Sequence, residues 1–155
     1  MSRSDSLLSN RQADLPRFSD ARGEAVVDSL GDAASLDADA RAFLTTVFSA
    51  APYLGRLAER RPRTMERILL DPPDAIYDDL LKTLRAASAE GDVEELGRCM
   101  RLAKADMHLL TALCDLAGVW SLDDATERLS RFADVCVAAG LEGLARESAG
   151  KGRMP

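Results

Sequence analysis

The sequence predicts an all-α protein, a bundle of about six to seven helices built around a long, mostly buried central helix. Three observations support this prediction. Apolar residues recur three and four positions apart along most of the 155-residue chain, and no run alternates long enough to make a strand. Alanine and leucine, both good helix formers, dominate the composition. Prolines and glycines stand at intervals that suit helix boundaries.

The chain divides into two regions of different composition. Residues 1–36 are rich in Ser, Asp, Arg and Gly, and we expect this segment to be poorly ordered or only partly helical. Within it, residues 20–30 suit a short helix. Residues 37–155 form the predicted helical domain, because the helical pattern is continuous from Asp37 onward.

Short helices are expected at the start of this domain. Acidic residues open the segment 37–51, which suits a helix N-terminus. Pro52 should end that helix and begin the next, over 52–60, since proline is tolerated at a first helical position. Another proline should begin a third short helix over 62–70.

Longer helices covering about 73–139 are predicted to form the core, and their short connections favour antiparallel neighbours. Gly91 suits the C-cap of the first of them, and Asp92 suits the N-cap of the central helix. Gly118 should end the central helix. Its main apolar line comprises Leu96, Met100, Ala103, Met107, Leu110, Cys114 and Ala117.

The last long helix should begin at Ser121, whose side chain can cap it together with Asp124 three residues later. We expect Gly140 to close this helix and a further short helix to follow. Its expected apolar stripe comprises Leu122, Ala125, Leu129, Phe132, Cys136 and Ala139.

One polar line crosses the apolar surface of the central helix. It comprises Arg101, Lys104, His108, Thr111 and Asp115, which recur three and four residues apart and therefore share one side. The line is either a solvated edge of a buried helix or a polar interface to another domain or a partner. Catalysis is disfavoured, because His108 has no matched nucleophile and Asp115 lies about two turns away.

Other charged residues are read as solvated helix surfaces. Their i,i+4 spacing predicts weakly stabilising pairs of Asp78 with Lys82, Glu94 with Arg98, Asp124 with Arg128, Glu127 with Arg131, and Glu142 with Arg146. Trp120, which follows the end of the central helix, is predicted to plug the core rather than to bind a ligand.

Charge and cysteine content exclude several classes of protein. A net charge of −6 argues against a nucleic-acid binder, whose affinity comes mostly from neutralising phosphates. Cys99, Cys114 and Cys136 are far apart at apolar positions, which favours reduced core thiols. The chain has no signal-peptide core and no apolar run of membrane-spanning length. We therefore expect a cytoplasmic protein with no membrane partner.

Recognisable catalytic motifs are missing from the sequence. There is no GxxxxGK[ST], no GxGxxG and no GxSxG. A single histidine and the lack of a close Cys/His cluster disfavour a metal site. The sequence therefore predicts no catalytic, cofactor-binding or metal-binding residue in this chain.

Two segments resemble a known family. The sequence "RCMRLAKADMHLLTALCDLAGVWSLDDATERLSRFADVCVAAGL" at 98–141 is similar to the helical region near the start of bacterial glutamine synthetase adenylyltransferase/adenylyl-removing enzymes. Upstream, "FSAAPYLGRLAERRPRTMERILLDPPD" resembles their "S-P-Y-L-x-x-L-x-x-R-x-P" segment. The pieces "DLAGVW" and "LSRFAD" are the most specific. The resemblance covers about 37–145, and one departure is Asp106, where the family usually has Glu.

The resemblance implies a role for the chain. It would be the N-terminal helical scaffold of the adenylyl-removing half, and the fragment itself would be non-catalytic. The intact enzyme would regulate nitrogen assimilation by adding AMP to glutamine synthetase and removing it by phosphorolysis, with ATP and Mg²⁺. Implied partners are glutamine synthetase, a PII-type signal protein and the chain's own catalytic domain, whose Gly-rich "S-D-x-D" motif is not present before Pro155.

A second function stays open on the residues alone. A stand-alone all-helical interaction module would use the same polar line and its flanking leucines to recognise a partner helix. A reading frame that continues into the "S-D-x-D" motif would favour the enzyme over this module.

Overall fold

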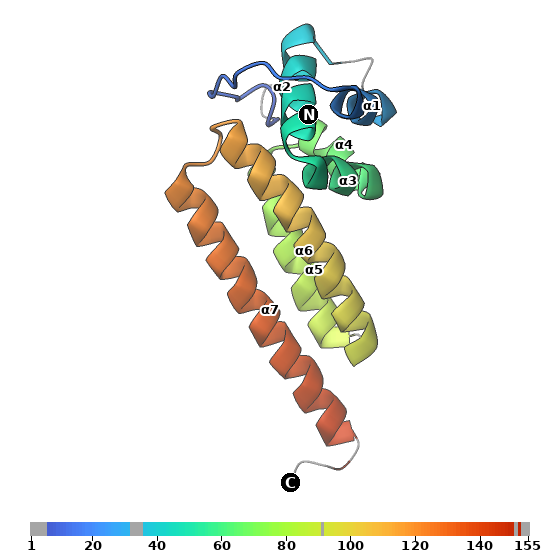
Figure 1. The fold of residues 1–155 in the computed structure, drawn as a ribbon. Coiled ribbons are helices and arrows are strands. Elements are labelled where there is room, and N and C mark those ends of the chain that lie inside the picture. Colours follow the sequence, from blue (N-terminus) through green and yellow to red (C-terminus); the bar gives the residue numbers. More distant parts are fainter. Residues whose placement is uncertain (1–5, 32–35, 91, 151, 153–155) are drawn as a thin grey trace.

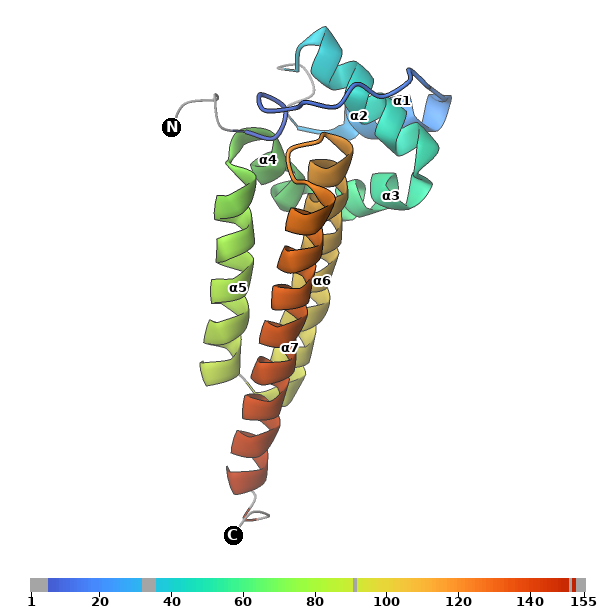
Figure 2. The same ribbon diagram turned by 90° about the vertical axis from the view of Figure 1, so that its left-hand side faces the viewer.

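The computed structural model describes residues 6–31, 36–90, 92–150 and 152. Within these residues it contains helices and no strand, which confirms the all-α prediction. The helices are α1 (Ala21–Ser29), α2 (Ala38–Ala50), α3 (Pro52–Arg60), α4 (Pro62–Leu70), α5 (Pro73–Glu90), α6 (Val93–Leu116) and α7 (Leu122–Gly150). The three longest, α5, α6 and α7, form an elongated bundle, and α1 to α4 gather at one end of it (Figures 1 and 2).

Successive helices of the bundle run antiparallel, as the short connections predict. Leu81 and Leu84 of α5, Met107 of α6 and Phe132 of α7 belong to one continuous core. That core extends upward to α2, where Leu44 and Phe48 have no exposed surface. None of the helices in the described part of the chain combines the length and apolar character that crossing a bilayer requires.

The central helix α6 is buried mainly over its second half. Nearly all of its buried residues lie between Ala103 and Cys114, where α3 and α4 also cover it. Toward its start Leu96 is buried, but Leu102 remains exposed. The expectation of a mostly buried central helix therefore holds for the half next to α3 and α4.

The expected helix starts are present. Pro52 and Pro62 are the first residues of α3 and α4. The Asp92 carboxylate accepts a hydrogen bond of 2.8 Å from the backbone N–H of Glu95. At α7 the capping is reciprocal: Asp124 N–H donates to Ser121 Oγ, and Ser121 N–H donates to the Asp124 carboxylate, both at 3.1 Å. The predicted C-cap, Gly91, lies outside the described residues.

Helix α7 does not end at Gly140 but continues to Gly150, which corrects the expected break. Gly140 does not have a positive φ, and no proline occurs between it and the end of α7 at Gly150. A glycine inside a helix costs only about 0.5–1 kcal/mol, which packing against α6 can offset. The expected apolar stripe of α7 is also partly wrong, since Leu122 and Leu129 are exposed.

The segment before α2 packs closely on the rest of the protein. Gly23 of α1 allows this approach, because a Cβ there would stand 2.7 Å from the backbone N of Ser49 and 2.8 Å from the Thr45 carbonyl oxygen. Leu7 has no exposed surface. The carbonyl of Ala117 accepts hydrogen bonds of 2.8 and 3.0 Å from the backbone N–H groups of Gln12 and Ala13.

Candidate functional site

The polar line of α6 lies along one edge of the bundle. Arg101, Lys104 and Asp115 are exposed, His108 is half-buried, and Thr111 is buried. The line is therefore open to solvent at its two ends and covered in its middle. Among the described residues, no hydrogen bond or ion pair joins Arg101, Lys104 or Asp115 to another side chain.

The covered middle of the line faces the helices at the end of the bundle. The Tyr53 hydroxyl of α3 and His108 Nδ1 share a hydrogen bond of 3.3 Å. The Thr111 hydroxyl is buried and has no hydrogen-bond partner within the described part of the chain. An unsatisfied buried hydroxyl costs on the order of 1–3 kcal/mol, so the polarity of Thr111 does not stabilise the fold.

The exposed part of the line runs beside the seam between α6 and α7. A Cβ built at Gly140 of α7 would lie 3.5 Å from the terminal methyl of Met100, so these two positions face each other. Arg101 follows Met100 directly, and Lys104 lies one turn further along the helix. In Figure 1, α5 lies behind α6 and α7, so this seam faces the viewer.

Sequence reasoning missed a buried ion pair that ties α6 to the start of α4. Asp106, which is nearly buried, accepts hydrogen bonds of 2.6 Å from Arg61 Nε and 2.5 Å from the second guanidinium nitrogen. Thr64 Oγ1 donates a third, at 2.7 Å. The hydrogen bond to Asp106 raises the pKa of Arg61 against the opposing effect of burial. The sequence feature that could have indicated this ion pair is Asp106, an acidic residue on the apolar side of α6.

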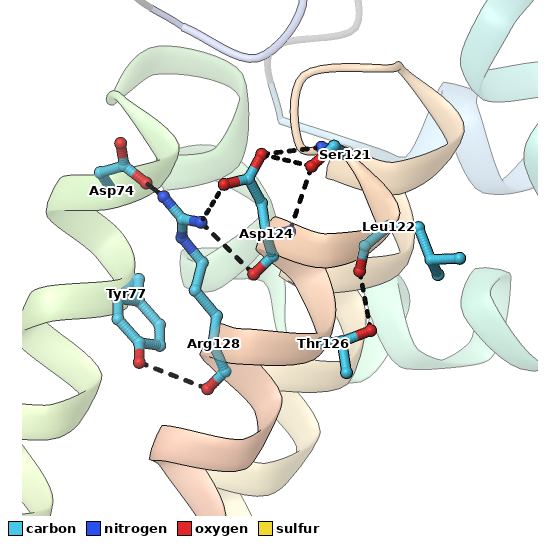
Figure 3. Close-up of polar contacts among 7 residues, drawn as sticks. All are labelled: Asp74, Tyr77, Ser121, Leu122, Asp124, Thr126 and Arg128. Carbon is cyan, nitrogen blue, oxygen red and sulfur yellow. Dashed lines mark hydrogen bonds and ion pairs between the residues drawn. The ribbon is translucent and has the colours of Figure 1, made fainter.

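A second cluster joins α5 to α7 around Arg128 (Figure 3). Arg128 donates to Asp74 of α5 at 2.9 Å and contacts Asp124 of its own helix at 3.4 Å. Its guanidinium carbon lies 4.5 Å from the centre of the Trp120 ring. The Tyr77 hydroxyl donates to the Arg128 carbonyl at 3.3 Å, and burial raises the pKa of Tyr77.

The Arg128 cluster confirms one prediction and extends another. Trp120 is buried, as expected of a residue that plugs the core. The predicted pair of Asp124 with Arg128 is present, but Arg128 also reaches Asp74 on α5. The cluster is therefore a structural clamp between helices, and it lies apart from the polar line.

Two other predicted pairs are corrected. Lys82 contacts Asp79 at 3.4 Å rather than Asp78. Arg98 donates to Glu95 at 2.5 and 2.9 Å rather than to Glu94. In both cases the carboxylate three residues before the base is the one reached, because i,i+3 neighbours also share a helix side.

The cysteines are all free. Cys114 is fully buried, and burial raises the pKa of its thiol well above the ordinary range. Burial also raises the pKa of Cys99 and of Cys136, each of which is partly buried. These thiols are therefore protonated at neutral pH, in keeping with the predicted reduced thiols.

A metal-binding cluster is not found among the described residues. No three or more His, Cys, Asp or Glu side chains within residues 6–31, 36–90, 92–150 and 152 stand close enough together to hold a metal ion. The Mg²⁺ that the resemblance implies for the intact enzyme therefore finds no fitting ligand set among them. What these residues offer is a rigid helical body with one partly polar, solvent-open edge.

Fold and site together define an all-helical body with one exposed polar edge. Residues 42–155 match the family described as glutamate-ammonia ligase adenylyltransferase. The chain belongs to this family.

Relatives with curated names support the same assignment. The chain is similar to the bifunctional glutamine synthetase adenylyltransferase/adenylyl-removing enzyme of Caulobacter vibrioides, with 38% identity over 139 residues, 90% of this chain and 14% of that protein. The enzyme so named from Bradyrhizobium diazoefficiens is 36% identical over 74% of the chain, and that from Mesorhizobium japonicum is 33% identical over 72%. The chain spans between 12% and 14% of these relatives' length. No solved structure gives a significant match.

Proposed function

We propose that the chain is the N-terminal helical scaffold of a bifunctional glutamine synthetase adenylyltransferase/adenylyl-removing enzyme. The observation that carries the proposal is the family match over 42–155, together with relatives of that name that are similar over most of the chain. In this role the helices support nitrogen regulation, because the intact enzyme adds AMP to glutamine synthetase and removes it. The 155-residue chain itself is non-catalytic.

The polar line provides the contact between this scaffold and the rest of the enzyme or its substrate. Arg101, Lys104 and Asp115 are exposed charges held on a long helix, so their spacing is fixed before any partner arrives. Such a rigid array loses little conformational freedom on docking. His108 and Thr111 complete the line, but His108 hydrogen-bonds Tyr53 of α3 and Thr111 is buried, so they position the edge rather than contact a partner.

Cofactors and further partners belong to the rest of such an enzyme. ATP and Mg²⁺ would be held by nucleotidyltransferase domains, and a PII-type signal protein would act on the intact cytoplasmic protein. Glutamine synthetase is the implied protein substrate, consistent with the names of the relatives.

A chimera tests the proposal. The segment of the Caulobacter vibrioides enzyme that matches this chain is replaced by the chain, and ADP release from adenylylated glutamine synthetase is measured with phosphate and Mg²⁺. We expect the chimera to keep adenylyl-removing activity within about tenfold of the parent, as expected when a scaffold is exchanged between relatives. A folded chimera without activity would overturn the scaffold role and favour the stand-alone interaction module.

The same assay tests the polar line with matched charge reversals. In the chimera, Arg101→Glu combined with Lys104→Glu should lower the activity. Lys82→Glu, an exposed reversal on α5 away from the line, should leave it unchanged. Equal effects of the two changes would remove the line from the contact.

A further inference from the structure

Helix α7 presents three distinct sides, and one of them is apolar yet exposed. Its buried side carries Ala125, Phe132, Ala139 and Gly143. A second side turns toward α5, where Arg128 contacts Asp74 and Glu142 accepts a hydrogen bond of 3.0 Å from Ser88. The third side carries Leu122, Leu129, Val137, Leu141 and Leu144, which are 39% to 74% exposed. We call this set the α7 stripe.

One charged residue borders the α7 stripe: the exposed Asp134 lies three residues before Val137 and seven before Leu141. The positions between its leucines on the same side are Thr126, Ala133 and Gly140, at helical spacings of three, four and seven residues. From Leu122 to Leu144 the stripe extends about 33 Å along the helix. Five exposed apolar side chains aligned over this length of one helix are typical of an interaction site.

The α7 stripe and the basic end of the polar line lie on the same side of the bundle. Gly140 belongs to the stripe side of α7 and faces Met100 of α6. Arg101 and Lys104 adjoin Met100 on α6, so their side chains border the stripe across the α6–α7 seam. The two features therefore form one surface with an apolar half and a basic half.

The two cations on this surface are unpaired. In the part of the chain that the structure describes, neither Arg101 nor Lys104 contacts a carboxylate, whereas Arg61, Arg67 and Arg128 each bind at least one. Asp115 belongs to the same line but lies about 16 Å from Lys104 along the helix. That distance exceeds the Debye length of about 8 Å at physiological salt, so Asp115 does not neutralise the pair.

We propose that this surface docks an acidic amphipathic helix, with apolar side chains on the α7 stripe and carboxylates beside Arg101 and Lys104. The proposal deepens the contact role of the polar line and rests on it only for the position of that contact. Helix-in-groove recognition of this kind uses apolar anchors at helical spacing for affinity and flanking charges for orientation. A partner helix of about six turns matches the length of the stripe.

A second copy of the chain fits this surface less well. Two copies paired antiparallel through their α7 stripes would bring their α6 helices to the same edge. The two Lys104 side chains would then lie about 9 Å apart along the helix axis and the two Arg101 side chains about 18 Å apart, so like charges oppose this pairing only weakly. A different helix that places carboxylates beside both Arg101 and Lys104 gains more from charge complementarity than a second copy does.

Two synthetic peptides of about 24 residues test the proposal. Both carry the same leucine stripe; one has glutamates and the other has lysines at the flanking positions. Each is labelled and titrated with the chain at physiological salt, and fluorescence anisotropy reports binding. We expect the acidic peptide to bind at least about tenfold more tightly than the basic one. Equal binding of the two, or no binding of the acidic peptide, would overturn the proposal.

Variants of the exposed residues locate the binding surface. Arg101→Glu with Lys104→Glu should reverse the preference, and Val137→Asp should weaken the acidic peptide at least about tenfold. Lys82→Glu on α5 serves as the matched control and should change nothing. All four substituted positions are exposed, and circular dichroism checks that each variant remains folded.

Sedimentation of the chain alone tests whether a second copy of the chain occupies the α7 stripe. Self-association that Val137→Asp abolishes would mean that a second copy occupies the stripe, and the acidic-helix proposal would be wrong. Because these measurements need no enzymatic activity, they can fail while the chimera remains active. The reverse result, binding without chimera activity, would reject the scaffold role alone.

Discussion

Arg61 and Asp106 form a bidentate ion pair. It joins the residue between α3 and α4 to the middle of α6. The two hydrogen bonds are 2.5 and 2.6 Å long, and the side chains are 25% and 10% exposed. Thr64 donates a further hydrogen bond to the same carboxylate. This pair sets how the α1–α4 end of the protein docks on the bundle, and it makes the stability of that junction depend on one carboxylate.

Asp106→Ala should therefore destabilise the protein strongly. Removing the carboxylate leaves Arg61 charged, partly buried and unpaired, which costs about 3 kcal/mol, the low end of the range for breaking a buried pair. Chemical denaturation measures the change in the free energy of unfolding. The matched control is Glu95→Ala, which breaks the exposed pair with Arg98 and should cost much less, because exposed ion pairs contribute little to stability. Similar losses for the two variants would contradict the structural role of Asp106.

Replacing Arg128 with lysine should destabilise the protein. Its guanidinium binds Asp74 and Asp124 while it stacks on Trp120, and an ammonium group cannot do both. We expect Arg128→Lys to cost about 1 kcal/mol and Arg128→Met somewhat more, from the lost hydrogen bonds and cation–π contact. Thermal unfolding followed by circular dichroism ranks the stability of the parent, the lysine variant and the methionine variant. A lysine variant as stable as the parent would show that the charge alone is sufficient.

Asp124 should make the start of α7 sensitive to acid. The Ser121 hydroxyl, the Ser121 backbone N–H and Arg128 hold the pKa of Asp124 below its usual range. The native state thus binds fewer protons than the unfolded chain, so stability rises with pH in this window. The contribution is complete above the unfolded pKa of about 3.9 and is lost as pH falls through the lower native value. The difference in Tm between the parent and Asp124→Asn should accordingly be larger at pH 6 than at pH 2. A constant difference would argue against this linkage.

Two glycines should respond in opposite directions to alanine. At Gly140 a Cβ would meet only the Met100 methyl at an ordinary 3.5 Å, so Gly140→Ala should stabilise α7 by about 0.4–1 kcal/mol. At Gly23 a Cβ would overlap Ser49 Oγ at 2.0 Å and approach backbone atoms of α2, so Gly23→Ala should cost about 2 kcal/mol or more. Urea denaturation of both variants measures the contrast. A destabilised Gly140→Ala would suggest that α7 needs flexibility at that point.

Local signals predicted the helix starts well. The caps at Asp92 and Ser121 and the prolines at positions 52 and 62 depend on residues within one turn, and all four begin helices in the structure. The predicted helix end at Gly140 was wrong because a glycine of this kind ends a helix where its backbone adopts the left-handed conformation. That conformation occurs at Gly118, with φ of +68°, and not at Gly140.

Long-range contacts could not be read from the pattern. Asp106 and Arg61 are 45 residues apart, and Asp74 and Arg128 are 54 residues apart. Only the packing of helices brings each pair together. The α7 stripe shows the same limit: three- and four-residue spacing marks Leu122 and Leu129 as apolar, but it does not say whether a neighbouring helix covers them. The spacing did place the polar line on one side of α6, whereas the burial of Thr111 depends on tertiary packing.

The non-catalytic scaffold role is tested most directly by assaying the purified chain alone. The chain is incubated with adenylylated glutamine synthetase, phosphate and Mg²⁺, and released ADP is measured over time. We predict no release above that of the substrate without the chain, while the chimera under the same conditions releases ADP. Release that rises in proportion to the concentration of the chain would contradict the proposed role and place catalytic residues within these helices.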